Sequence, residues 1–315
     1  MYSAEQSSSR GESKMDLSNL RLMNAAGWCK DVATVRKLSR TPVVEITVGS
    51  ITKETRPGNE GSVFWQSPDG TYALNSLGLP NPGIEKYREI LPEMQAIAND
   101  AGKALRVSIA GFSPVEYAEL AHAVAPHADV IEINLGCPNV WGEGGQKPIA
   151  SFDVSLMREI LDGVGKVTSG IDVDVAAKVS PYSDPGLLAK VIDLLKMFEF
   201  SVSEVVTSNT FPNAFAWDGE KTAITAGGGF AGMSGRAMKG IALGQAQRFR
   251  SELPFIAGED DLPAMETVGV GGITCGRDIL DYMRCGITSL QVGTHYFVHG
   301  EKVFSELLAE CAELV

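Results

Sequence analysis

The residues with the clearest chemical potential lie in one short segment, Ile131 to Asn139. An apolar run that is typical of a strand ends in Asn134, and Cys137 follows three residues later. Side-chain amides can hold the edges of a flat polar heterocycle, because each offers donors and an acceptor. A thiolate beside them can take up a proton. Pro138 has a fixed φ and disfavours helical geometry at Cys137, which predicts a stiff turn.

An isolated cysteine is more often a small buried side chain than a reactive group. The flanking asparagines and the glycine-rich segment 142–145 favour a functional site at Cys137. Cys29, Cys275, Cys285 and Cys311 lack such polar neighbours, and we interpret them as structural. The odd total of five cysteines and their scattered spacing indicate a reducing compartment. The absence of any Cys-x-x-C motif argues against a structural zinc site or an iron–sulfur cluster, so no metal is expected.

Length and composition exclude several classes of partner. The 315-residue chain has 44% hydrophobic and 21% charged residues, the balance of a soluble globular protein. Its net charge of −12 argues against nucleic acid or an anionic membrane as a general partner. Residues 1–17 lack the apolar core of a signal peptide, and no apolar run reaches the roughly 18–20 residues that span a bilayer. We therefore expect a cytoplasmic protein without membrane insertion.

Strand-like apolar segments alternate with amphipathic helical segments along the chain. The strands are expected near 20–24, 43–48, 105–110, 129–134, 173–179, 203–208, 266–270 and 288–292. The helices are expected near 31–39, 84–100, 114–124, 153–163, 185–198, 238–250, 276–285 and 301–313. One helix start is specific, because Ser113 can cap it and Pro114 suits its first position.

Eight strands alternating with eight helices predict an α/β fold of the closed (β/α)8 TIM-barrel type. An open doubly wound sheet has the same alternation and stays an alternative. Residues 1–15 are expected to form a disordered tail, and residues 16–315 a single barrel domain. Segment 58–80 interrupts the pattern, and its Ser67-Pro68-Asp69-Gly70 stretch predicts an inserted hairpin.

Polar residues and glycines recur where the expected strands end. Catalytic residues of such barrels come from the C-terminal ends of the strands. Eight coincidences of this kind are hard to ascribe to turns alone. The segments are Asn24–Gly27, Gly49–Ser50, Ala110–Gly111, Asn134–Asn139, Lys178, Thr207–Thr210, Gly269–Gly272 and Gly293–Thr294.

The glycines after the last two strands are candidates for a phosphate site. Gly271-Gly272 and Gly293-Thr294 follow strands seven and eight, where barrels often bind phosphate through backbone N–H groups. Each pair alone is better explained as a plain turn. A third glycine-rich segment, 226–235, is expected to form a loop over the cofactor that carries this phosphate. It matches neither a Walker loop nor a Rossmann fingerprint.

Two lysines and one asparagine are further candidates. Lys178 interrupts an apolar strand, although a lysine at a strand end can also extend its amine to solvent. Lys30 is a weaker candidate, because it stands where a surface lysine would be ordinary. Asn75 offers another amide within a stretch rich in turn formers.

Together these motifs make the chain resemble the dihydroorotate dehydrogenases, FMN-dependent barrels of pyrimidine biosynthesis. The resemblance runs from about residue 20 to 312. The motifs that carry it are Asn24–Gly27, Arg56–Asn59, Asn75–Asn81, Asn134–Asn139, Lys178–Pro181, Thr207–Thr210, Gly232–Gly235, Gly269–Ile273 and Gln291–Thr294.

The resemblance implies oxidation of dihydroorotate to orotate. Cys137 would be the general base at C5, hydride would pass from C6 to flavin N5, and the loop after Cys137 would act as a lid. Lys30 would act beside Cys137. The substrate would meet Asn75, Gly78, Leu79, Asn134, Asn139, Asn209 and Thr210. FMN would meet Ala25, Ala26, Gly27, Ser50, Lys178, Ser208, Ser234, Gly235, Gly271, Gly272, Gly293 and Thr294.

The family resemblance is mixed in class. The cysteine base is similar to class 1, whereas the motifs around the second and sixth strands are similar to class 2. The lysine of the class 1 second strand corresponds to Val48, and Lys30 would take over its cationic role. Position 77, which is often Met or His in the family, is Leu in this chain. Position 136, which is often Ser, is Gly. The acceptor stays open among fumarate, NAD through a partner subunit, and a quinone, and a homodimer is expected.

Two other functions remain in view. The cysteine and the following glycine-rich segment are also similar to dihydropyrimidine dehydrogenase barrels, which would keep FMN but change the substrate. A basic residue for the orotate carboxylate distinguishes the two, and Lys30 is the candidate. The third possibility is a flavin-free phosphate-binding barrel, acting as an isomerase, a lyase or a binding module.

Overall fold

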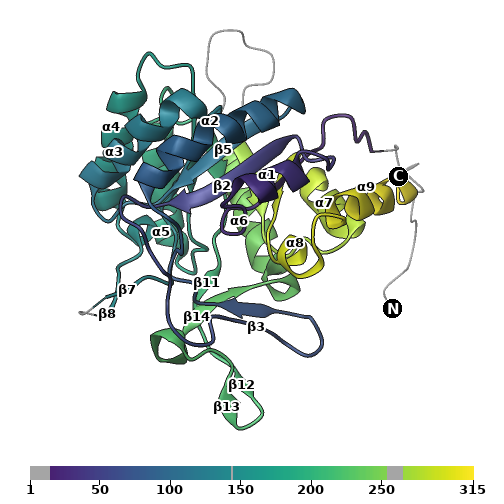
Figure 1. Cartoon of the computed structure of the whole chain (residues 1–315). Helices are drawn as coiled ribbons and strands as arrows, with labels where there is room; N and C mark the ends of the chain where they lie inside the picture. Colours follow the sequence, from purple (N-terminus) through teal and green to yellow (C-terminus); the bar gives the residue numbers. More distant parts are fainter. Residues whose placement is uncertain (1–14, 143–144, 254–264) are drawn as a thin grey trace, which may run out of the picture.

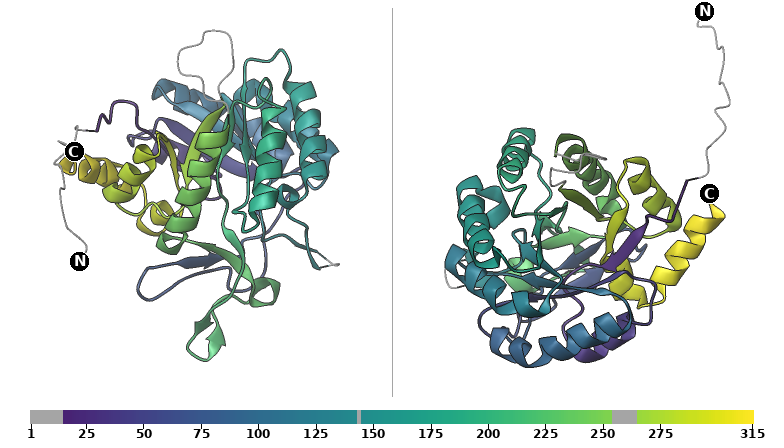
Figure 2. Two further views of the ribbon diagram at one scale, coloured as in Figure 1. Left: turned by 180° about the vertical axis from the view of Figure 1, so that it is seen from behind. Right: turned by 90° about the horizontal axis from the view of Figure 1, so that it is seen from above.

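A computed structural model describes residues 15–142, 145–253 and 265–315. Its centre is a closed parallel barrel with the strand order β1-β16-β15-β10-β9-β6-β5-β2. Figure 1 shows the barrel from the side, and the right-hand view of Figure 2 shows the ring of helices around it. This confirms the expected TIM barrel and excludes the open sheet. The tail expected at residues 1–15 falls almost wholly outside the described residues.

The barrel strands agree closely with the sequence prediction, because each is a short apolar segment bounded by turn formers. Their bounds are β1 Arg21–Asn24, β2 Glu45–Ile51, β5 Ala104–Ile109, β6 Val130–Asn134, β9 Asp174–Lys178, β10 Glu204–Val206, β15 Glu266–Val270 and β16 Ser289–Val292. Most hydrophobic side chains of the core lie between these strands and the helices.

The helices follow their predicted positions with two differences. Their bounds are α1 Val32–Leu38, α2 Ile84–Asp100, α3 Pro114–Val124, α4 Val154–Thr168, α5 Pro185–Lys196, α6 Lys239–Glu252, α7 Gly276–Arg284, α8 Thr294–His299 and α9 Val303–Glu313. Helix α4 runs past its predicted end because Val164 and Thr168 continue its buried face. Helix α8 was not predicted. The Ser113 side chain caps α3 as expected. In the described part of the chain, no helix is long and apolar enough to cross a membrane.

A small antiparallel sheet covers the end of the barrel where the site lies (Figure 1). It contains the predicted hairpin, β3 Phe64–Gln66 and β4 Ala73–Asn75. Strands β14 Ala231–Ser234 and β11 Phe211–Ala214 extend it. The expectation of a loop over 226–235 is therefore wrong for its second half, because β14 pairs with β4. A second hairpin, β12 Trp217–Asp218 and β13 Lys221–Thr222, projects from this sheet (Figure 1).

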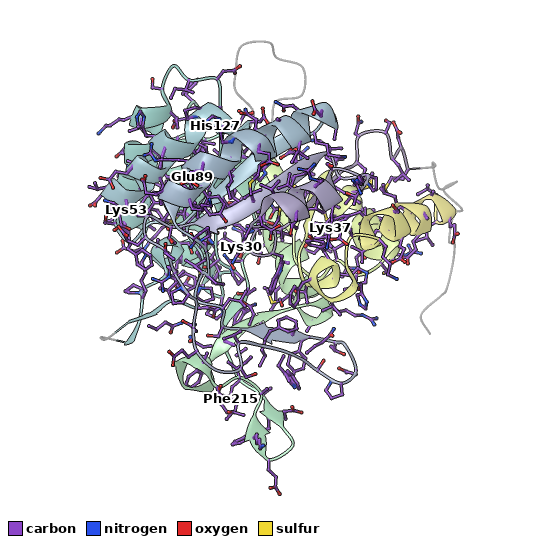
Figure 3. The ribbon with its side chains drawn as sticks, in the orientation of Figure 1. Lys30, Lys37, Lys53, Glu89, His127 and Phe215 are labelled. Carbon is purple, nitrogen blue, oxygen red and sulfur yellow. The ribbon has the colours of Figure 1, made fainter. Side chains whose placement is uncertain are left out.

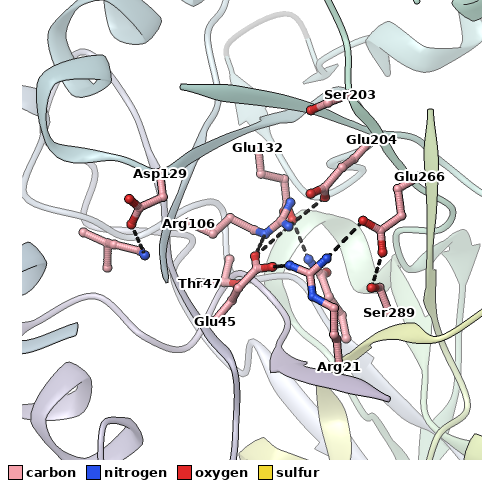
Figure 4. A network of polar contacts seen from close by, with 12 residues as sticks. Arg21, Glu45, Thr47, Arg106, Asp129, Glu132, Ser203, Glu204, Glu266 and Ser289 are labelled. Carbon is pink, nitrogen blue, oxygen red and sulfur yellow. Dashed lines mark hydrogen bonds and ion pairs between the residues drawn. The ribbon is translucent and has the colours of Figure 1, made fainter. Parts of the chain in front are cut away.

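The barrel interior near the N-terminal ends of the strands holds charged side chains rather than a purely apolar core (Figure 4). Arg106 is fully buried and pairs with Glu45 and Glu204, each at 2.7 Å. Arg21 bridges Glu45 to Glu266. Burial raises the pKa of Glu204 to about 7, although the charge of Arg106 acts in the opposite direction.

Candidate active site

The predicted site residues all line one cavity. It measures about 580 Å³ and opens between the C-terminal ends of the barrel strands and the small sheet. This volume suits a cofactor together with a small substrate. Every candidate lines it, from Lys30 and Cys137 to the substrate and cofactor candidates named above. In Figure 3 the Lys30 side chain lies between the barrel and the small sheet. The structure thus brings the whole predicted set together, and their individual roles stay predictions.

Four asparagines form two linked pairs in this cavity. Asn139 donates to the Asn75 side chain at 2.9 Å, which ties the segment after β6 to the small sheet. Asn209 donates to the Asn134 side chain at 3.1 Å, and Asn134 donates to Ser50 Oγ at 2.9 Å. Each pair still has donors and acceptors free to face a ligand. The arrangement suits a flat ring with polar atoms on opposite edges.

One buried hydroxyl next to these pairs lacks a partner. Thr210 Oγ1 is shielded from solvent and makes no hydrogen bond within the part of the chain that the structure describes. A buried polar atom without a partner costs free energy, about 1–3 kcal/mol. Because Thr210 lines the cavity, a polar ligand atom can satisfy it there.

The Cys137 thiol is partly buried among cations. Burial raises its pKa above the ordinary value, because the thiolate loses solvation. The backbone N–H of Asn139 and the charges of Lys147, Arg56 and Lys30 act in the opposite direction. The site can therefore form a thiolate that is strongly basic and still electrostatically supported.

Lys30 extends into the same cavity and donates to the carbonyl of Pro80 at 2.5 Å. Its own carbonyl accepts a hydrogen bond from Tyr87, which fixes this part of the backbone. Burial lowers the pKa of Lys30 to about 8, and the negative charge of Cys137 raises it. An ammonium with two remaining donors is well suited to a substrate carboxylate.

Lys178 is held in a closed ring of three side chains. Its Nζ donates to Gln291 Oε1 at 2.9 Å and lies 3.3 Å from Glu132 Oε1. Gln291 donates in turn to Glu132 at 2.6 Å. Lys178 and Gln291 both line the cavity, and all three side chains are buried. The lysine is therefore a fixed cation at the cavity floor, and the snorkelling alternative is excluded.

The glycines after β15 form a close backbone approach. Gly271 and Gly272 have positive φ, and a Cβ at Gly272 would lie 2.4 Å from Cα of Lys239. Glycine is the residue that adopts this conformation without strain. Beside it, Thr294 and Ser234 are joined by a hydroxyl hydrogen bond of 2.8 Å. These groups line one arm of the cavity and leave the backbone open to an anion.

Two departures from the family pattern acquire a structural meaning. Val48 is fully buried in the core shared with the helices and is not among the residues that line the cavity. Val48 therefore supplies nothing to the cavity, whereas Lys30 lines it and supplies a cation there. At Gly136, an added Cβ would lie 2.9 Å from Ser180 Oγ. Ser180 occupies the space that a serine at position 136 would need, and it brings its own hydroxyl there.

The segment after Cys137 forms a short hairpin, β7 Trp141–Gly142 and β8 Gly145–Gln146. Gln146 donates to the carbonyl of Pro138, which ties the hairpin back to the site. Residues 143–144, at the tip of the predicted lid, lie outside the described residues. The lid itself therefore stays a prediction.

Several residues at the site were not predicted. Glu132 and Gln291 are polar residues within apolar strands. The same pattern made Lys178 a candidate, and it could have made candidates of these two residues as well. Arg56 belongs to the Arg56–Asn59 motif, but the sequence assigned it no role at the site. His295 and His299 line the cavity from α8, with ring centres 4.7 Å apart. Nothing in their sequence context distinguished them, because the short helix that carries them was not predicted.

Comparisons with known proteins agree with this geometry. Residues 13–315 match the family model for dihydroorotate dehydrogenase. The dihydroorotate dehydrogenase (fumarate) of Saccharomyces cerevisiae is 29% identical over 301 residues, covering 93% of this chain and 88% of the relative. That of Lachancea kluyveri is 28% identical over 299 residues, with the same shares covered.

Solved structures support the fold. The ferulenol complex and the ligand-free form of DHODH from Eimeria tenella superpose with TM-scores of 0.74 and 0.75. Both are 17% identical, cover 93% of this chain, and are themselves covered to 80% and 83%. The family model extends over the whole barrel and every residue that lines the cavity. The chain therefore belongs to the dihydroorotate dehydrogenase family.

Proposed function

We propose that this protein oxidises dihydroorotate to orotate in pyrimidine biosynthesis, with FMN as its cofactor. Membership of a flavin-dependent family and the names of the yeast relatives support the reaction. The single observation that carries it is the meeting of Cys137, Lys30 and the four asparagines in one cavity. A base, a cation for a carboxylate and paired amides for a pyrimidine ring are what dihydroorotate requires.

The residues present fit FMN. Gly271 and Gly272 line the cavity without side chains, so their backbone can approach a phosphate closely. Lys178 presents a buried ammonium, which suits the electron-rich N1 and O2 edge of a reduced flavin. Ala25 and Ser50 line the same cavity. FMN, when bound, supplies the acceptor for the hydride that leaves C6 of the substrate.

Cys137 is the proposed general base. Its thiolate takes the proton from C5 of dihydroorotate, while the Asn139–Asn75 and Asn209–Asn134 pairs hold the two edges of the ring. Lys30 binds the carboxylate and stabilises the neighbouring thiolate. Thr210 offers its free hydroxyl to the same ligand. These contacts fix the substrate relative to the base, which is the main contribution that positioning makes to rate.

We infer a cysteine-base enzyme of class 1 that uses fumarate as its electron acceptor and forms a homodimer. The names of both yeast relatives specify fumarate. Fumarate is a small dicarboxylate, and the cation of Lys30 suits it as well as it suits orotate.

The test is anaerobic reduction of the flavin-loaded protein, followed by reoxidation. Dihydroorotate should bleach the flavin spectrum, and fumarate should restore it faster than NAD or a quinone analogue. Orotate should perturb the spectrum of the oxidised protein. A flavin spectrum that neither dihydroorotate nor orotate changes would instead favour another dihydropyrimidine as the substrate.

A further inference from the structure

A second, much smaller cavity adjoins Cys137. It measures about 20 Å³, and Cys137, Asn134 and Leu79 line both it and the main cavity. The thiol therefore borders the substrate space and this second space at once. A volume above roughly 10–15 Å³ suffices for one water molecule. Asn134 and the backbone at Gly111 offer polar atoms that can bind such a water.

Lys147 lines the small cavity and connects it with the surface. Its Nζ donates to the carbonyl of Gly111 at 2.6 Å and lies 4.2 Å from the ring centre of Phe112. Phe112 is 39% exposed, and the Lys147 side chain is partly exposed. The backbone N–H of Lys147 donates to Val140 at 2.8 Å, which fixes its position beside the thiol.

Other ionisable groups near the thiol are unsuited to carry its proton away. The Tyr117 hydroxyl also lines the small cavity, but it donates to the carbonyl of Asn134 at 2.7 Å and burial raises its pKa. Arg56 donates to Gly78 at 3.0 Å, and a guanidinium does not release its proton in proteins. Lys30 lines the substrate cavity and not the small one. The Glu116 carboxylate accepts the backbone N–H of Phe112.

We propose that Lys147 takes the proton of Cys137 through the small cavity and releases it to solvent, restoring the thiolate for the next turnover. This inference rests on the proposed function, in which Cys137 accepts the proton from C5. The Sγ–H bond breaks, one water relays the proton, and an N–H bond forms on the neutral Lys147 amine. The resulting ammonium then loses a proton to bulk water, so the step needs no oxidant or reductant.

The acid–base properties of Lys147 suit the release of the proton. Burial lowers the pKa of Lys147, so a neutral amine is present at lower pH and its ammonium loses a proton to water more readily. Burial also raises the pKa of Cys137, so the transfer depends on the position of Lys147 beside the small cavity. The charges of Lys147, Arg56 and Lys30 lower the pKa of Cys137 and so favour the thiolate. The charge of Glu116 raises the pKa of Lys147.

The test compares Lys147→Met and Lys147→Arg in the flavin-loaded protein, with dihydroorotate as the donor and a one-electron dye as the acceptor. We expect Lys147→Met to slow turnover by about 10–100-fold. Added ethylamine should restore part of this rate. Lys147→Arg should remain slow, because it keeps the charge but cannot release the proton. Lys190→Met, at an exposed position of α5, is the matched control and should behave as the parent.

A second readout is independent of turnover. The rate of Cys137 alkylation is followed against pH in the flavin-loaded, substrate-free protein, with the modified peptide quantified by mass spectrometry. The profile should move to higher pH in Lys147→Met and stay near the parent in Lys147→Arg. Lys147→Arg retains the cation over Phe112, so it keeps the test valid if Lys147→Met does not fold.

Parent-like turnover in Lys147→Met, or full activity in Lys147→Arg, would overturn the proton-exit role. A different result would show that Cys137 is not the base. In that case dihydroorotate would reduce the flavin of Cys137→Ala at the parental rate in a single turnover, independently of the Lys147 variants.

Discussion

The Lys178 ammonium and the Glu132 carboxylate lie 3.3 Å apart at the floor of the cavity, and neither is exposed to solvent by more than 6%. They come from the neighbouring strands β9 and β6, and Gln291 closes the ring between them. A buried pair of this kind stabilises little by itself, but removal of one partner leaves an uncompensated charge.

Lys178→Met should therefore lower the free energy of unfolding by about 3–5 kcal/mol, because Glu132 then stays buried without its cation. Lys178→Met combined with Glu132→Gln should regain most of this loss, since no unpaired charge remains. Denaturant unfolding of both variants without added flavin measures the difference. Equal stability of the single and double variants would show that the pair is not coupled in this way.

The charge of Lys30 should control substrate affinity. Lys30→Met should raise the KM for dihydroorotate by about 10–100-fold, the usual loss for a charge-assisted hydrogen bond. In the parent, burial holds the pKa of Lys30 at about 8, so the ammonium is complete below that pH and is lost above it. KM should accordingly rise with pH through this value. Lys30→Arg should flatten that rise, and a parent KM independent of pH would argue against carboxylate binding by Lys30.

The backbone at Gly272 should matter for the cofactor. Gly272→Ala places a Cβ 2.4 Å from the Lys239 backbone at a φ of +71°, so the segment must shift. We expect the Kd for FMN to rise by at least about tenfold, as loss of one or two phosphate contacts implies. Gly240→Ala is the control, because its Cβ would meet nothing within 4 Å. Titration of each cofactor-free variant with FMN measures its Kd. Equal Kd values for the two variants would show that the backbone at Gly272 does not contribute to FMN binding.

The buried carboxylate of Glu204 predicts a pH dependence of stability. Its pKa is about 7 in the folded protein, above its ordinary value, so the folded state binds the proton more tightly than the unfolded state. Stability should therefore fall as pH rises from about 5 to about 8. Glu204→Gln stays neutral and keeps a partner for Arg106, so its Tm should vary less over this range. If the Tm of parent and variant changed with pH to the same extent, that result would contradict the pKa assigned to Glu204.

The sequence predicted the barrel and the residues that line its cavity, because the same residues control both. Most strands end at or beside a glycine, asparagine or lysine that interrupts an apolar run, and the C-terminal ends of barrel strands converge. Residues as distant along the chain as Asn24 and Gly293 could thus be assigned to one end of the barrel without a structure. The hairpin at Ser67–Gly70 was visible for the same reason, since its turn formers separate two apolar triplets.

What the sequence could not supply was the pairing between distant elements. The ring of Lys178, Glu132 and Gln291 joins three strands, and no local pattern indicates which charges meet inside a barrel. Strand β14 also escaped prediction, because its glycine-rich sequence has weak strand propensity and becomes a strand only by pairing with β4. The cations around Cys137 come from separate loops. Their effect on the thiol needed the geometry.

The central claim is that Cys137 is the base in dihydroorotate oxidation, and the pH profile of flavin reduction tests it most directly. Anaerobic mixing of the flavin-loaded protein with saturating dihydroorotate gives the rate of the chemical step. We predict a rate that rises with pH through the raised pKa of Cys137, and a loss of about 10²–10⁴-fold in Cys137→Ala with the flavin still bound. A Cys137→Ala protein that dihydroorotate reduces at the parental rate would contradict the account.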